Sequence, residues 1–292
     1  MDVSIILVNY NTKDLIINCI NSIKEHTIGL SYEIIIVDNG SKDGSKDFFS
    51  KQKDITYLYQ TNNIGFGQAN NLGARFARGK YLFLLNSDTI LINNAIKVLY
   101  QFITTHGKTT GIVGGILTDT NNQENGSFGY FPTMKDSMLK LIKKGRSNLK
   151  YSKKQLLDLT HKGFCEVDYV LGADMMISKH LFENLQGFDP AFFMYYEESD
   201  LQKRSSNKGY KNYIIKTAQI HHLVNASVNQ LPTNKKRIMV NKSMFIYLKK
   251  HHLHILYIIF KFTFCALEFF KAFTGKYTIK ENIEYLKTIA RI

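Results

Sequence analysis

Residues 3–11 read Val-Ser-Ile-Ile-Leu-Val-Asn-Tyr-Asn, and residues 33–41 read Glu-Ile-Ile-Ile-Val-Asp-Asn-Gly-Ser. Each stretch is a run of β-branched and aliphatic residues that ends in polar, turn-forming residues, which is typical of a buried strand. Between them, Thr12 is expected to cap a helix whose apolar face is formed by Ile16, Cys19, Ile20 and Ile23. This part of the sequence therefore predicts a strand, a helix and a second strand.

The same alternation continues along the following residues. Further strands are predicted at 55–59, 81–85 and 111–117, and helices at 67–78 and 93–106. Such alternation predicts an α/β fold with a mainly parallel sheet and helices on both of its faces.

Polar side chains follow three of the predicted strands. Asn9 ends the first strand, Asp38 ends the second, and Asn86-Ser87-Asp88 ends the fourth. Because ligands of parallel sheets bind beyond the carboxyl ends of the strands, these residues predict a ligand site at one edge of the sheet.

Composition limits the class of protein. The chain has 292 residues, of which 44% are hydrophobic and 21% are charged, which argues against a disordered chain. The net charge of +14 is concentrated in residues 135–154, with eight basic residues and one acid, and in residues 235–291, with twelve basic residues and three acids. These segments lie outside the sheet edge and form no recognisable nucleic-acid module, so nucleic acid is not the expected partner.

The cysteines and the hydropathy pattern suggest a reducing, intracellular compartment. The three cysteines are far apart and form no CxxC pair, which disfavours a disulfide framework or a cysteine zinc site. The N-terminus lacks a basic segment with a cleavage site, so no secretory signal is expected. The most apolar window, residues 253–270, contains a histidine, a lysine and a glutamate, so no spanning helix is predicted.

Five motifs occur in the order and spacing of a known family. They are residues 3–11, residues 36–44, Asn63-Ile64-Gly65 through Gly73, Leu84-Leu85-Asn86-Ser87-Asp88, and residues 187–201, which include Gly187-Phe188-Asp189 and Glu197-Glu198-Ser199-Asp200-Leu201. Together they resemble glycosyltransferase family 2, over roughly residues 3–227. Within this family, the sequence most resembles the rhamnosyltransferase-like enzymes of bacterial surface polysaccharide synthesis. The resemblance implies the GT-A fold and a nucleotide-sugar donor.

The resemblance also implies a donor site and a divalent metal, Mg²⁺ or Mn²⁺. The donor-binding positions that match the family are Val8, Tyr10, Asp38, Asn63, Gly65, Asn71, Asn86 and Ser87. Asp88 matches the metal ligand of the family's DxD element, and either His221 or His222 matches a late histidine that reaches the metal or the diphosphate. Asn86 stands where the family has its first aspartate, which removes one negative charge. Asn71 is equally compatible with helix packing.

The acidic cluster is expected to supply the general base of an inverting transfer. A carboxylate among aromatic residues is partly desolvated, which raises its pKa towards the useful range. By resemblance Glu198 is the base, although the family has aspartate there; Glu197 and Asp200 are the alternatives. Asp200 could also stabilise only the start of a helix. The loop Gly172-Ala173-Asp174 resembles the family's loop that shapes the acceptor pocket, which implies that Asp174 contacts the acceptor.

These motifs suggest two regions. Residues 1–230 are expected to form the catalytic domain, with a donor half at about 1–118 and an acceptor half at about 119–230, and residues 231–292 a basic, amphipathic helical extension. Because such segments can lie on anionic membranes and the expected acceptor is a glycan or a polyprenyl-linked glycan, we expect peripheral attachment to the inner face of the cell membrane. Helices packed on the domain are the alternative. Residues 135–154 are expected to form a basic loop.

Two other classes of function remain open. A sugar nucleotidyltransferase also uses an α/β sheet and a metal, but residues 8–11 offer no glycine-rich basic phosphate loop. A non-catalytic scaffold with the same fold is favoured slightly by the two departures from the family pattern, Asn86 and Glu198.

Overall fold

A computed structural model describes residues 1–143, 151–223, 233–271 and 277–292. In this part of the chain a nine-stranded sheet has the order β3-β2-β1-β4-β10-β6-β11-β5, and β8 pairs with β11. Its strands are β1 (Val3–Asn9), β2 (Tyr32–Asp38), β3 (Ile55–Tyr59), β4 (Tyr81–Asn86), β5 (Thr89–Leu91), β6 (Thr110–Thr118), β8 (Phe164–Val167), β10 (Asp174–Ser178) and β11 (Lys211–His222). The short strands β7 (Phe128–Gly129) and β9 (Tyr169–Val170) pair separately.

The four N-terminal strands form a parallel unit. β1 lies between β2 and β4, and the register pairs Asn9 with Asp38 and Val8 with Asn86. Three predicted site positions therefore lie side by side at the carboxyl edge. The predicted α/β class is confirmed. The sequence did not predict β10, which runs antiparallel between β4 and β6.

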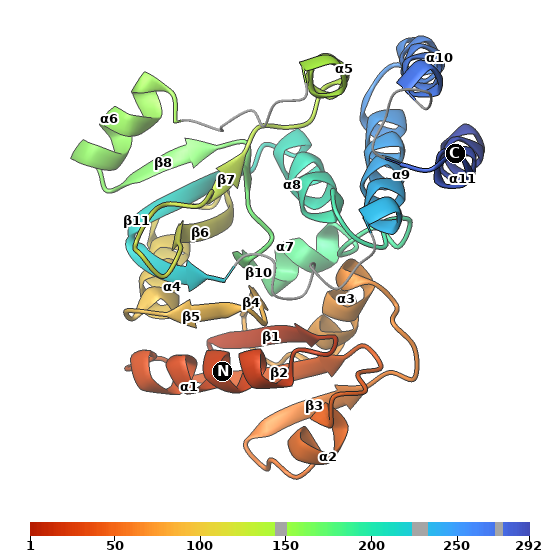
Figure 1. Cartoon of the computed structure of the whole chain (residues 1–292). Coiled ribbons are helices and arrows are strands. Elements are labelled where there is room, and N and C mark those ends of the chain that lie inside the picture. Colours follow the sequence, from red (N-terminus) through yellow and green to blue (C-terminus); the bar gives the residue numbers. More distant parts are fainter. Residues whose placement is uncertain (144–150, 224–232, 272–276) are drawn as a thin grey trace.

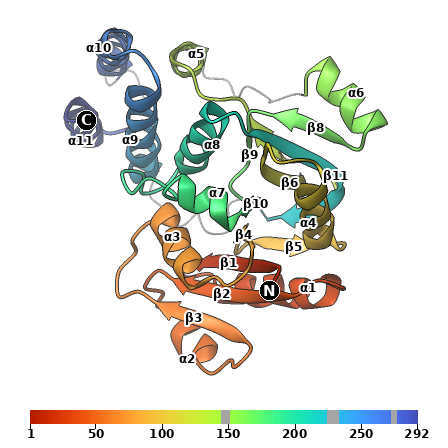
Figure 2. The same ribbon diagram turned by 180° about the vertical axis from the view of Figure 1, so that it is seen from behind.

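Helices cover both faces of the sheet, as expected (Figures 1 and 2). They are α1 (Lys13–His26), α2 (Ser45–Phe49), α3 (Phe66–Phe76), α4 (Ala95–Thr105), α5 (Met134–Lys143), α6 (Lys153–His161), α7 (Lys179–Asn184) and α8 (Glu197–Asn207). Alternate β1 residues face opposite ways: Ile5 belongs to a core with α1 and α4, and Ile6 to a core with α3, α7 and α8. This alternation explains why the strand is apolar at nearly every position.

Two local expectations are wrong. Thr12 precedes α1 but makes no side-chain cap; its hydroxyl donates instead to Asn9 Oδ1, at 2.9 Å. Residues 134–143 form α5 and residues 153–161 form α6, so the basic segment is not simply a loop. Its central residues, 144–150, lie outside the described residues, as does the expected domain boundary at residue 230.

The C-terminal extension is helical, as predicted, with α9 (Thr233–His251), α10 (His254–Lys271) and α11 (Ile279–Ala290). Figures 1 and 2 both show α9 beside α8, with α10 and α11 on its outer side. A third apolar cluster joins the three helices to the rest of the protein through Leu141 of α5 and Phe192. None of the helices in the described part of the chain is long and apolar enough to cross a bilayer.

Candidate active site

Asp38 lies at the centre of the carboxyl edge and is fully buried. Its Oδ2 accepts hydrogen bonds from Asn9 Nδ2 at 2.9 Å and from the Tyr57 hydroxyl at 2.7 Å, and its Oδ1 accepts one from the Ser41 amide at 2.7 Å. Burial, together with the hydrogen bond to Asp38, raises the pKa of Tyr57, so its hydroxyl remains a donor. Tyr57 was not singled out in the sequence because a tyrosine within a strand looks like an ordinary core residue.

A second cluster forms where β4 meets the end of β11. Nε2 of His222 lies 3.4 Å from Asp88 Oδ1 and 3.5 Å from Asn86 Nδ2. His221 faces the other way, with its Nδ1 2.9 Å from the Thr118 hydroxyl. The structure therefore brings His222, and not His221, to Asp88.

The chemistry of this cluster is compatible with a divalent cation. Asp88 supplies a hard carboxylate oxygen, the ligand type that suits Mg²⁺ or Mn²⁺, and His222 an imidazole nitrogen, which binds divalent transition metals. The Nδ1 of His222 is buried without a hydrogen-bond partner. No group of three or more His, Cys, Asp or Glu side chains converges on a metal position within the described ranges. A metal here would therefore need further ligands from a bound diphosphate or water.

The remaining donor-side residues line the same edge in different ways. Ser87 is largely buried, and its hydroxyl lies 3.2 Å from the Thr12 hydroxyl, to which it can donate because the Thr12 proton is directed at Asn9. Val8 is half-buried, whereas Tyr10 is 43% exposed just beyond β1. Tyr10 is thus the residue of this group that is most free to contact a ligand.

The Asn63–Gly65 loop connects the donor edge to the acidic segment. Asn63 Oδ1 accepts a hydrogen bond from the Gly65 amide at 2.9 Å, and the next amide, of Phe66, donates to Phe193 O at 3.0 Å. Gly65 has φ +87°, and a Cβ there would lie 2.4 Å from Phe193 O. Only glycine therefore permits this close approach.

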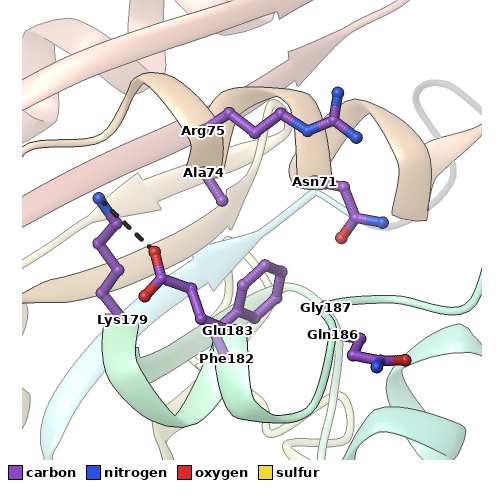
Figure 3. Close-up of a pocket in the computed structure, with 8 residues that line it drawn as sticks. All are labelled: Asn71, Ala74, Arg75, Lys179, Phe182, Glu183, Gln186 and Gly187. Carbon is purple, nitrogen blue, oxygen red and sulfur yellow. Dashed lines mark ion pairs between the residues drawn. The ribbon is translucent and has the colours of Figure 1, made fainter.

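Asn71, in the middle of α3, also connects the donor side to the segment that leads to the acidic residues. Its Oδ1 accepts from the Phe188 amide and its Nδ2 donates to Phe188 O, both at 2.8 Å. This geometry corresponds to the packing alternative rather than to donor contact. Asn71 also lines a cavity of about 180 Å³ between α3 and α7, with Arg75, Lys179 and Glu183 (Figure 3). The predicted catalytic acids do not line this cavity.

Two acids begin α8, directly after the aromatic loop. Glu197 is 4% exposed and its Oε2 has no hydrogen-bond partner, whereas Glu198 is partly exposed. A helix N-terminus favours negative charge, but burial outweighs it here: burial raises the pKa of both glutamates, most strongly that of Glu197, which the neighbouring Glu198 raises further. Glu197 therefore holds its proton when Glu198 has already lost its own. A Cβ at Gly172 would lie 3.6 Å from Glu198, so the predicted acceptor loop adjoins it.

The third acid of the cluster has different surroundings. Asp200 is fully buried and contacts Arg204 Nε at 2.8 Å, Lys250 Nζ at 2.9 Å and His251 Nε2 at 2.8 Å. Burial alone would raise its pKa, but the hydrogen bond from His251 and the charges of Arg204 and Lys250 lower the pKa of Asp200 to about 2. Both oxygens are engaged by cations of the protein.

Asp174 lies at the start of β10 and is also fully buried. Its Oδ2 accepts a hydrogen bond from the Gly115 amide at 2.6 Å, while Oδ1 has no partner. Burial raises the pKa of Asp174 well above its ordinary value. The side chain therefore sits inside the sheet, with no surface open to an acceptor.

Comparisons with known proteins bear on the family and the fold, and they confirm the predicted GT-A fold. The model of the family described as glycosyl transferase family 2 matches residues 4–182. The mannosyltransferase PcManGT of Pyrobaculum calidifontis, solved with GDP-Man and Mn²⁺, superposes with a TM-score of 0.58 at 16% identity, over 99% of this chain and 86% of that one. That likeness concerns the fold.

Three curated relatives are similar in sequence. Glycosyltransferase GlyG of Streptococcus pneumoniae is 31% identical over 46% of this chain and 44% of its own length. Rhamnosyltransferase WbbL of Escherichia coli K12 is 24% identical over 75% of this chain and 83% of its own. The Escherichia coli enzyme WfaP, named UDP-Glc:alpha-D-GlcNAc-diphosphoundecaprenol beta-1,3-glucosyltransferase, is 34% identical over 35% of this chain and 41% of its own. The chain thus spans less than half the length of GlyG and of WfaP.

Proposed function

Because the chain belongs to glycosyl transferase family 2, we propose that it transfers a sugar from a nucleotide-sugar donor to a hydroxyl group of a glycan acceptor in polysaccharide synthesis. The observation that carries this proposal is the convergence of Asp88, Asn86 and His222 beside β1, on the same sheet edge as the buried Asp38. A nucleotide diphosphate fits such an edge because ligands bind beyond the carboxyl ends of the strands.

In this proposal Asp88 and His222 would hold a divalent cation, Mg²⁺ or Mn²⁺. When bound, the cation neutralises charge on the departing diphosphate as a Lewis acid. Asn86, whose Nδ2 lies 3.5 Å from His222 Nε2, would donate a hydrogen bond to the diphosphate once that nitrogen binds the cation. The exposed Tyr10 and the Asn63–Gly65 loop would contact the nucleotide sugar from the neighbouring strand ends.

Glu198 would act as the general base. Of the two acids that begin α8, Glu198 is the more exposed, so an acceptor can reach it. Its partial burial raises its pKa, which strengthens it as a proton acceptor. The acceptor hydroxyl would lose its proton to Glu198 while its oxygen attacks the anomeric carbon and the nucleoside diphosphate departs. One displacement inverts the anomeric centre and needs no covalent intermediate. Asp200 already contacts Arg204, Lys250 and His251 and has no place in this step.

The substrates are proposed from the relatives. The similarity to WbbL supports rhamnose as the donor sugar, and the similarity to WfaP supports a polyprenyl-diphosphate-linked glycan as the acceptor. Such an acceptor would be presented at the inner face of the cell membrane, in the cytoplasm.

A surface of the extension suits an anionic bilayer. α10 exposes large apolar side chains along its length, and α11 adds two at its start: Ile255, Leu256, Ile258, Ile259, Phe262, Phe269, Phe270, Ile279 and Ile283. Phe262 alone is 78% exposed. The basic excess of residues 235–291 complements anionic headgroups, while the apolar side chains would enter the acyl boundary. We therefore take a phospholipid bilayer, and not a second protein copy, as the occupant.

Co-sedimentation with vesicles tests this surface. Phe262→Glu is expected to weaken binding to phosphatidylglycerol vesicles severalfold. Phe76→Glu, at an exposed phenylalanine of α3 (52%) outside the extension, is the control and should bind as the wild type does. Equal binding of all three proteins would contradict membrane docking by α10.

A transfer assay tests the enzymatic proposal. The protein is incubated with dTDP-, UDP- or GDP-sugars, a polyprenyl-diphosphate glycan and Mn²⁺ or Mg²⁺, and products are identified by mass spectrometry. Metal-dependent sugar transfer with release of nucleoside diphosphate is the expected result. Release of pyrophosphate from a nucleoside triphosphate and a sugar phosphate would instead identify a nucleotidyltransferase. Absence of both reactions in folded protein would favour the scaffold.

A further inference from the structure

The loop that presents the acidic pair is strained. Tyr195 and Tyr196 have φ of 70° and 68°, and they immediately precede Glu197. Side chains with a Cβ rarely adopt this left-handed conformation, which persists only when surrounding contacts impose it. The structure must therefore contain groups that hold residues 192–196 in place.

Helix α9 of the extension supplies those groups. Phe192 is fully buried in the apolar cluster of the extension. The Ser243 hydroxyl donates to Met194 O at 2.8 Å, and the rings of Tyr196 and Tyr247 lie 5.8 Å apart. Two positions of the strained loop thus contact one helix that is about fifty residues later in the chain, and a third is buried in the apolar cluster that this helix helps to form.

The end of α9 also fixes the first turn of α8. Lys250 contacts Asp189 at 2.6 Å and Asp200 at 2.9 Å, so one ammonium group joins both ends of the segment that carries the acids. His251 Nε2 donates to Asp200 at 2.8 Å, with only 7% of its side chain exposed. A buried carboxylate held by several donors is a rigid contact, because breaking it would leave an uncompensated charge.

We propose that the extension is a working part of the acceptor side of the active site, in which Lys250 and His251 are positioning residues that fix Glu198 through Asp200. The extension would then do more than attach the enzyme to a membrane, since it imposes the strained conformation of residues 192–196. This inference rests on the proposed role of Glu198 as the base.

The experiment removes the contacts from the side of the extension. Lys250→Met and His251→Phe delete the two partners that α9 provides for Asp200, whereas Lys250→Arg and His251→Gln retain a donor in each place. Lys249→Met is the matched control, because Lys249 is exposed on the same turn and its Nζ contacts the terminal Ile292 O, at 3.4 Å, rather than an acid of α8. Arg237→Met removes the buried pair with Glu268 and controls for general loosening of the extension.

Three quantities are measured for each full-length variant: kcat for transfer, Kd for the nucleotide with Mn²⁺, and amide hydrogen exchange of residues 192–198. We expect Lys250→Met/His251→Phe to lower kcat by at least about tenfold, because small displacements of a reacting group are costly. Exchange should accelerate by a similar factor, while the nucleotide Kd stays within about twofold because the donor edge lies on other strands. Lys250→Arg/His251→Gln should recover most of both losses.

Two outcomes would overturn the inference. One is a double variant whose kcat and exchange match those of Lys249→Met. The other is an Arg237→Met variant that loses kcat to the same extent, because the effect would then be general destabilisation. If the wild type transfers no sugar, the proposed function fails; the exchange measurement still decides whether α9 holds residues 192–198.

Discussion

Two adjacent glutamates with different surroundings allow a sharp test of the catalytic assignment. Glu197 is almost fully buried, with an unpartnered Oε2, and burial keeps it protonated when Glu198 is ionised. Glutamine has the shape and the charge of a protonated glutamate. Glu197→Gln therefore changes little that is chemically relevant, whereas Glu198→Gln removes the only proton acceptor proposed for the acceptor hydroxyl.

The losses of kcat expected for the two variants differ by orders of magnitude. Loss of a general base lowers kcat by about 10²–10⁴, which corresponds to about 3–5 kcal/mol of transition-state free energy. For Glu197→Gln we expect kcat within about threefold of the wild type, or roughly 0.6 kcal/mol. The wild-type profile of kcat/KM should fall on the acid side at a pH above 4.5, because burial raises the pKa of Glu198 above that ordinary value.

The assay is steady-state sugar transfer from the nucleotide sugar, between pH 4.5 and 9, with thermal unfolding curves to show that both variants fold. A Glu197→Gln variant that loses as much activity as Glu198→Gln would refute the assignment of the base. So would a Glu198→Gln variant that retains near-normal turnover.

Further predictions concern stability and the buried carboxylates. Because the pKa of Asp200 falls from 3.8 to about 2 on folding, the native state gains about 2 kcal/mol that is fully present above pH 3.8 and is lost as the pH falls towards 2. Asp200→Asn should lower the free energy of unfolding at neutral pH by at least that amount and reduce its dependence on pH between 4 and 2, measured by urea denaturation; an unchanged dependence would contradict the ion-pair network. Tyr57→Phe should cost about 1.5–3 kcal/mol, because it removes a hydrogen bond to the Asp38 carboxylate. Tyr59→Phe, at a 36% exposed ring of the same strand, should change stability by less than about 0.5 kcal/mol.

The N-terminal half of the fold could be predicted from the sequence because its signals are local. Residues 3–9 and 32–38 are apolar runs that end in polar turns, and these runs are the parallel strands β1 and β2. The later half mixes antiparallel and parallel pairs, since β11 pairs with β5, β6 and β8. No local pattern specifies those partners, because pairing over long sequence separations depends on the completed sheet.

The candidate site, too, could be predicted from the sequence only where the signal is local. Motif order located Asp88, Asn86 and the acids of α8, but the match at the late histidine was uncertain by one residue and could not distinguish His221 from His222. Neighbouring residues of a strand point to opposite faces, so the structure was needed to show which of the two reaches Asp88. The contacts of Asp200 with Lys250 and His251 join residues about fifty positions apart and leave no periodic signal. Thr12 was expected to cap α1, but the nearby Asn9 side chain, itself held by Asp38, competes for its hydroxyl.

Calorimetric titration with nucleoside diphosphates tests the central claim most directly. dTDP, UDP and GDP are titrated with and without Mn²⁺ into the wild type, Asp88→Ala and the control Asp158→Ala, whose carboxylate lies on α6 and pairs with Lys162. The account predicts binding of one nucleotide that requires the metal, is retained by Asp158→Ala and is lost in Asp88→Ala. Equal binding by a folded Asp88→Ala variant, independent of metal, would contradict it.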